Sequence, residues 1–176
     1  MNNEVFLVDS NTFITPYKTY YPFDIAPSFW MFLRENIENG NIVILSKVYE
    51  EVERGKDSLS EWLQNIDFAQ ADHRVPKILA IYGQVLTHIQ DGESPLGTHL
   101  YNEKALREWA DNDRADGWLI ATAKAESYTL ISFEKPNSAL GTSASSHPKI
   151  PDVAAALSVE CRNLYDMMRA LGFTFK

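Results

Sequence analysis

The fold of this chain is decided by the stretch Val5-Phe6-Leu7-Val8-Asp9-Ser10-Asn11 near its start. Four consecutive apolar residues predict a short strand buried on both faces, as strands are in a parallel sheet covered by helices. The strand ends on an acid, and ligands of such sheets gather beyond the carboxyl ends of the strands. Asp9 is therefore a candidate functional residue at this edge. The alternative interpretation is that Asp9-Ser10-Asn11 only starts a turn, because all three residue types favour turns.

The size and composition of the chain are those of one globular domain. It has 176 residues, of which 45% are apolar and 23% charged, so we expect a single domain over residues 1–176. The sequence contains no run of about 18 apolar residues and no secretory signal pattern, so no membrane association is expected. The one cysteine, Cys161, cannot form an internal disulfide, which favours a cytoplasmic location.

The formal net charge is -8, from 24 acids against 16 lysines and arginines. This balance argues against broad, charge-driven binding of nucleic acid, which needs a basic surface. Acids that gather in one pocket would behave differently, because they would bind a divalent cation that in turn binds a phosphate.

Segments with strand and helix character alternate along the chain. Besides the first strand, strands are predicted at 42–45, 128–132 and 158–161, and helices at 27–39, 46–55, 113–126 and 164–171. Three more helices, at 58–65, 75–90 and 101–110, are expected to form a helical insertion at about 58–110. Residues 15–26 and 138–147 are predicted to be loops. This alternation predicts an α/β fold with a parallel sheet and right-handed crossovers.

A second candidate acid, Glu51, lies on the helix that follows the second strand. Val48 and Val52 are four residues apart and share the buried face, so Glu51 lies close to that face. A partly buried glutamate needs a partner, because burying an unpaired charge is costly. The alternative is an exposed glutamate in an acidic run.

Asp116 lies near the start of a later helix. Asp113 as N-cap with Asp116 three residues on resembles a capping box, which by itself would explain both acids. The same position would also direct Asp116 toward the edge of the sheet where Asp9 lies, if the next strand is parallel to the first.

Further polar candidates follow the third predicted strand. Ser132 and Glu134 project to one side beyond its last residue, although a turn before Lys135-Pro136 would also explain them. Asp152 follows a proline and is compatible with an ordinary turn.

Several site chemistries have no matching motif. The four histidines show no ligand spacing, and neither a nucleophile elbow nor a glycine-rich phosphate loop occurs. Oxygen ligands without imidazole or thiolate indicate Mg²⁺ or Mn²⁺.

The order of these motifs resembles that of the PIN domain, the metal-dependent ribonuclease fold of VapC-type toxins. The resembling segments are Leu7-Val8-Asp9-Ser10-Asn11, Ser46 with Val48-Tyr49-Glu50-Glu51-Val52 and Gly55, Ala115-Asp116-Gly117-Trp118-Leu119-Ile120-Ala121, and Thr129-Leu130-Ile131-Ser132-Phe133-Glu134. The Tyr20–Ile25 loop, Trp30 and Lys149–Val153 resemble a PIN-like subgroup of bacteria and archaea. The chain departs from the family at Ser132 and Glu134, which replace Thr and Asp, and in the long insertion.

The resemblance implies a three-layer α/β/α sandwich around a parallel sheet and an endoribonuclease that hydrolyses RNA phosphodiester bonds. The implied catalytic and metal-binding residues are Asp9, Glu51, Asp116 and Glu134, which would hold one or two Mg²⁺ or Mn²⁺ ions. Asn11, Ser132 and Asp152 would orient the ligands or a water, and Lys47, Arg54 and Lys149 are candidates for steering RNA.

Two partners are also expected, a cognate antitoxin if the chain is a toxin and a second copy of the chain. The homodimer is predicted because Phe29-Trp30-Met31-Phe32 supplies more apolar surface than one helix face needs for a core.

Two competing functions stay open. The first is a PIN-fold binding or regulatory module with weak catalysis. The second is aspartyl-phosphate chemistry with Asp9 as nucleophile, but Asn11 stands where the phosphatase pattern needs a second Asp, and Leu45-Ser46 supplies no acid for a receiver domain. Bound Mn²⁺ with RNA cleavage that depends on a divalent ion would separate the nuclease from both.

Overall fold

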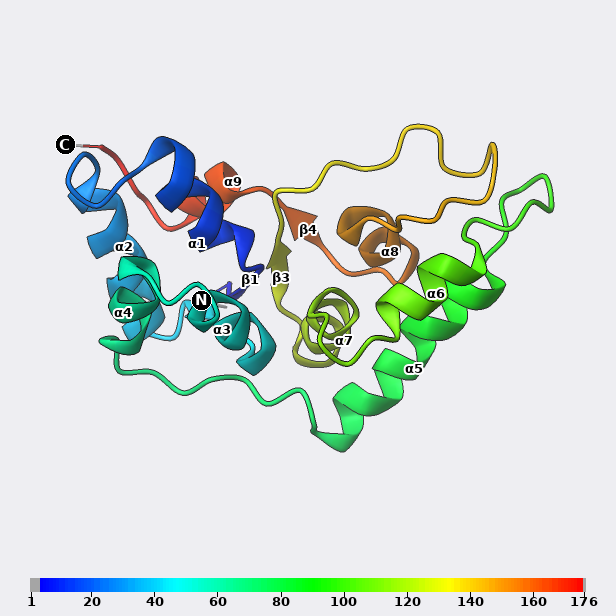
Figure 1. Ribbon diagram of the computed structural model, residues 1–176, viewed down its shortest axis with the longest axis horizontal. Coiled ribbons are helices and arrows are strands. Elements are labelled where there is room, and N and C mark those ends of the chain that lie inside the picture. Colours follow the sequence, from blue (N-terminus) through cyan, green and yellow to red (C-terminus); the bar gives the residue numbers. More distant parts are fainter. Residues whose placement is uncertain (1–3, 176) are drawn as a thin grey trace. The chain divides into compact units, whose positions relative to one another are not determined.

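The computed structural model describes residues 4–175, which divide into two compact units (Figure 1). Within the described residues, unit 1 consists of residues 4–72, 129–133 and 162–175, and unit 2 of residues 73–128 and 134–161. The predicted insertion at 58–110 is divided between the units, because its first helix belongs to unit 1 and the other two belong to unit 2. The prediction of a single domain stays a prediction.

A four-stranded sheet with the order β2-β1-β3-β4 organises unit 1. Its strands are β1 (Phe6–Val8), β2 (Ile42–Val43), β3 (Thr129–Ile131) and β4 (Cys161–Arg162). Strand β1 is fully buried and pairs in parallel with β2 and β3, with Leu7 opposite Val43 and Leu130. The apolar run at the chain start therefore forms the central strand, and the predicted α/β fold with a parallel sheet is confirmed.

The helices of unit 1 are α1 (Asn11–Thr15), η1 (Pro16–Tyr20), α2 (Pro27–Glu38), α3 (Ser46–Glu53), α4 (Ser58–Gln64) and α9 (Leu164–Ala170). The last of these begins as predicted, because Asn163 accepts a hydrogen bond from the Asp166 amide, and Gly172 follows with φ of 73°. The predicted loop at 15–26 is wrong in its first part. Pro16 has helical backbone angles, and as the first residue of η1 it needs no N–H donor, so the chain stays helical to Tyr20.

Aromatic side chains fill the part of unit 1 around α2. Phe29, Trp30 and Phe32 are buried, and Trp30 packs against Phe23 and Trp62 with ring centroids 4.5 Å and 5.0 Å away. The argument for a homodimer from this helix is therefore wrong, since the core uses these rings and only the neighbouring Met31 is exposed. The homodimer itself stays a prediction.

Unit 2 is helical and contains α5 (Pro76–Asp91), α6 (Glu103–Trp109), α7 (Asp116–Glu126) and α8 (Ile150–Ala156). Helix α7 packs along α5, and the rings of Tyr82 and Trp118 stack 3.7 Å apart at an interplanar angle of 8°. Helix α8 was not predicted, because Pro-Asp was interpreted as a turn. Pro151 instead lies in the first turn of the helix, where proline is well tolerated.

The alternative interpretation of Asp113 and Asp116 as a capping box before α7 is wrong. The helix begins at Asp116, its N-cap is Ala115, and no side chain caps it. Asp116 is thus the acid of the first turn, where a negative charge interacts favourably with the helix dipole. Of the helices within residues 4–175, none is long and apolar enough to cross a membrane.

We expect Gly117→Ala to destabilise the protein by about 1 kcal/mol or more, although alanine is the better helix former. A Cβ at position 117 would lie 2.8 Å from Cε2 of Tyr82, whose ring is held by its stacking on Trp118. Gly83→Ala is the matched control, because no atom lies within 4 Å of its added Cβ, and it should raise the melting temperature. Thermal denaturation compares the two variants, and equal stabilisation by both would contradict the packing argument.

Candidate functional site

Asp9 directly follows β1, at the carboxyl end of the central strand. Its side chain is buried, with the residue only 4% exposed. The Ser10 hydroxyl donates to Oδ1 of Asp9 at 3.2 Å, and the Asn11 amide donates to Oδ2 at 3.4 Å. Both carboxylate oxygens are therefore oriented by the residues that follow the strand.

The charge of Asp9 is held in an unfavourable environment. Burial, with a smaller contribution from the negative charge of Glu51, raises the pKa of Asp9 from the ordinary 3.8 to about 6, against the lowering effect of the hydrogen bonds from Asn11 and Ser10. The Glu51 contribution places the two acids within electrostatic reach of each other in unit 1. A cation at this position would relieve both the burial cost and the repulsion.

Glu51 lies on α3 next to the buried face of that helix. Val48 and Val52 are buried and Glu51 is half-buried, as the four-residue spacing predicts. On the same helix, Lys47 is only 6% exposed, so the candidate role of Lys47 in steering RNA from the surface is wrong. Its long side chain reaches into the protein from the first turn.

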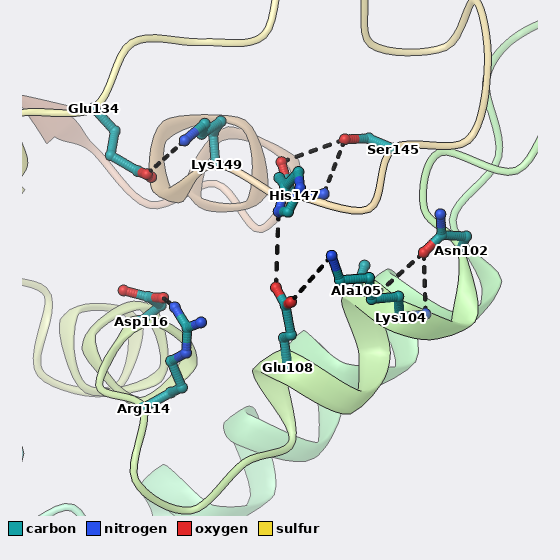
Figure 2. A network of polar contacts seen from close by, with 10 residues as sticks. All are labelled: Asn102, Lys104, Ala105, Glu108, Arg114, Asp116, Glu134, Ser145, His147 and Lys149. Atoms are coloured by element: carbon teal, nitrogen blue, oxygen red, sulfur yellow. Dashed lines mark hydrogen bonds and ion pairs between the residues drawn. The ribbon is translucent and has the colours of Figure 1, made fainter.

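Asp116 lies in unit 2 as the first residue of α7. Arg114 points toward it, with Nη1 3.9 Å from Oδ2 of Asp116, as Figure 2 shows. The carboxylate is partly exposed and lies at the positive end of its helix, which favours a negative charge there.

Glu134 has both carboxylate oxygens engaged. Oε1 accepts from Nζ of Lys149 at 2.9 Å (Figure 2). Oε2 accepts from the Ile150 amide at 2.7 Å. Asp152 acts on the same segment, since its Oδ2 accepts from the Asn137 amide at 2.9 Å. These contacts fix the start of α8 to the chain that leaves β3.

The structure thus brings together some of the predicted site residues. In unit 1, Asp9 has Asn11 and Glu51 beside it, and Ser132 is buried after β3, where its amide donates to the Arg162 carbonyl. The acids Asp116, Glu134 and Asp152 belong to unit 2. Among residues 4–175, neither unit by itself contains three His, Cys, Asp or Glu side chains placed to hold a metal ion. The convergence of Asp9, Glu51 and Asp116 stays a prediction.

Two polar residues near Asp9 were not singled out from the sequence. Ser10 orients the Asp9 carboxylate, and its place directly after the acid could have indicated this role. Thr12 is fully buried, and its hydroxyl makes no hydrogen bond to any residue that the structure describes. No sequence signal identifies Thr12, because threonine is common in the first turns of helices.

Comparison with known proteins agrees with the fold. The structure is similar to a chain in the crystal structure of VapBC2 from Rickettsia felis bound to a DNA fragment from their promoter, with a TM-score of 0.50. The match covers 90% of this chain and 98% of that chain at 18% sequence identity, which shows a shared fold alone. The protein is therefore an α/β protein that shares the fold of that chain.

The chain belongs to the family described as "Domain of unknown function (DUF4411)", which matches residues 6–175. No curated protein matches the chain.

We expect Asp9→Asn to stabilise the metal-free protein at neutral pH by roughly 3 kcal/mol at most, the equivalent of the rise in pKa. The pKa of Asp9 is higher in the folded protein than in the unfolded one. Wild type therefore has its full stability below about pH 4, where Asp9 is protonated in both states, and loses up to that free energy as the pH rises through 6. The gain from Asp9→Asn should therefore be small at pH 4 and full above pH 6.

Urea denaturation in EDTA at both pH values measures this difference. Asp24→Asn, which removes an exposed acid of the same unit, is the control and should change little at either pH. A gain from Asp9→Asn that is equal at pH 4 and pH 7 would contradict the raised pKa.

Proposed function

We propose that this protein is an endoribonuclease that depends on Mg²⁺ or Mn²⁺ and hydrolyses phosphodiester bonds in RNA. The observation that carries the proposal is the buried Asp9 carboxylate at the carboxyl end of the central strand, within electrostatic reach of Glu51. This is the edge at which ligands of parallel α/β sheets bind. The PIN-like fold supports the assignment by analogy, since fold alone does not determine function.

The residues present fit a hard divalent cation. Asp9 and Glu51 offer carboxylate oxygens, which Mg²⁺ and Mn²⁺ prefer, and a buried acid with a raised pKa is stabilised in its ionised form by a cation. We propose Asp116 as the third ligand, from its place in the motif order. Glu134 is the least suited of the four predicted ligands, because Lys149 and the Ile150 amide already occupy its oxygens.

The chain's own residues would hold and orient the reacting groups. Ser10 and Asn11 fix the Asp9 carboxylate through their hydrogen bonds, so that its outward lone pairs keep one direction. Asp9 and Glu51 together would bind the ion and position the scissile phosphate beside it. A bound divalent ion supplies Lewis-acid activation of the phosphate and of a water.

A toxin role with a cognate antitoxin is a further part of this proposal. It is supported by the fold shared with a chain of the VapBC2 crystal structure, in which VapBC2 is bound to a DNA fragment from their promoter. Expression of the wild-type chain alone should then slow growth, whereas the Asp9→Asn chain should not. Co-expression with the product of the neighbouring gene should restore growth if that product is the antitoxin.

We expect Asp9→Asn to reduce RNA cleavage by at least about 100-fold while the protein stays folded, because a ligand charge is lost and the shape is kept. Cleavage of a labelled RNA in Mn²⁺ and in EDTA measures activity, and the melting temperature in the same buffers measures metal binding. Metal should raise the melting temperature of wild type more than that of the variant.

Asp24→Asn is again the control and should keep both the activity and the metal-induced shift. Cleavage by Asp9→Asn at the wild-type rate would refute the nuclease site. A metal-induced shift in wild type without any cleavage would favour the binding module instead.

A further inference from the structure

A group of exposed aromatic side chains in unit 1 has no role in the core or in the carboxylate site. We call Tyr20, Tyr21, Tyr165 and Phe175 the aromatic platform. Tyr20, Tyr165 and Phe175 are 66%, 52% and 54% exposed, although aromatic residues of this size usually bury most of their surface. Contiguous exposed apolar surface is typical of a binding site.

Tyr21 connects the members of the platform. Its ring centroid lies 6.4 Å from that of Tyr20 and 5.4 Å from that of Phe175. Burial, together with a hydrogen bond to Tyr165, raises the pKa of Tyr21. Tyr21 itself packs on the buried ring of Phe29 at 4.9 Å, so the platform is supported from below by the core. The rings are therefore held in place before any ligand binds.

The platform is joined to Asp9 by a continuous helical segment. Helix α1 begins two residues after Asp9 and continues through Pro16 into the π-helix η1, which ends at Tyr20. π-helical turns are rare and are often found at functional sites. At about 1.5 Å per residue, Tyr20 lies roughly 14 Å along this segment from Asn11. This distance corresponds to about four stacked nucleotides at ~3.4 Å each.

The charge of the platform differs from that of the whole chain. Although the chain has a net charge of -8, η1 carries Lys18 and no acid. Helix α9 carries Arg169 and Asp166, which form an ion pair at 3.1 Å. The exposed Asp24, three residues after Tyr21, offsets Lys18, so the segments around the platform are close to neutral. A polyanion therefore meets less repulsion there than the net charge of the whole chain implies.

We propose that the aromatic platform stacks the bases of a single-stranded segment of the RNA substrate, about four nucleotides from the phosphate at Asp9. The proposal rests on the nuclease function proposed above and adds the structural class of the substrate. Stacking uses the face of a base, which every base offers, so binding should depend little on sequence. Bases paired in a duplex are covered by their neighbours, and duplex RNA should therefore bind more weakly.

The test is fluorescence anisotropy in EDTA, where binding is measured without cleavage. The probes are a labelled 12-nucleotide oligoadenylate, the same oligonucleotide paired with oligouridylate, and a 12-nucleotide abasic chain. Wild type should bind the single strand most tightly. Tyr20→Ala and Tyr165→Ala should each weaken that binding by about fivefold or more, the usual effect of losing one stacked base. Tyr20→Phe keeps the ring and should stay within about twofold of wild type.

Leu96→Ala is the control for loss of exposed apolar surface, since Leu96 is 89% exposed and lies in unit 2. Melting temperatures confirm that each variant is folded. Equal binding of the abasic chain, or unchanged binding by both tyrosine-to-alanine variants, would overturn the proposal. Light scattering that shows a dimer in wild type and a monomer in Tyr20→Ala, with RNA binding unchanged, would also overturn it and make the platform a protein contact.

Failure of this inference can be told apart from failure of the nuclease proposal. If wild type binds the single strand through the platform but cleaves no RNA in Mn²⁺, the platform stands and the nuclease activity does not. If wild type cleaves RNA and the platform variants bind and cleave like wild type, the nuclease stands and the platform proposal is refuted.

Discussion

The burial of one carboxylate at the end of the central strand is the constraint around which unit 1 is built. Strand β1 lies between β2 and β3 and is covered on both faces, so the residue that follows it is also removed from water. Burying a charge there is costly unless other groups compensate it. Ser10 and Asn11 supply part of that compensation from the first residues after the strand. The residual cost appears as the raised pKa of Asp9, and it is the physical reason to expect a cation.

The aromatic content of unit 1 serves two purposes that the structure separates. Phe29, Trp30 and Phe32 are buried and hold α2 in the core. Tyr20, Tyr165 and Phe175 remain exposed around Tyr21, whose ring rests on that core. The buried rings contribute to the stability of the unit, and the exposed rings form the surface at which we propose that RNA bases stack.

In unit 2, polar contacts hold the long connection between β3 and α8 to the start of α8 and to α6. Glu134 and Asp152 accept hydrogen bonds at the start of α8, one from Ile150 and the other from Asn137. On α6, Glu108 lies 3.8 Å from His147 and 3.7 Å from Lys104 (Figure 2). The motif order also assigns Glu134 to metal binding. Because its two carboxylate oxygens already accept hydrogen bonds from Lys149 and from the Ile150 amide, Glu134 is poorly suited to bind a metal ion as well.

The sequence by itself determined the central strand, the acid that ends it and the amphipathic face of α3, because these depend on a continuous apolar run and on an apolar spacing of four residues. It also determined that α9 ends before Gly172, through the backbone freedom of glycine. The burial of Lys47, the core role of Trp30 and the absence of a side-chain cap before α7 were decided only by the tertiary structure. Each depends on which distant segments pack together, and the same residue types suit a surface, a core or a cap. For the same reason, the sequence could name Asp9 and Glu51, but only their packing in one unit decided that the charge of one acts on the other.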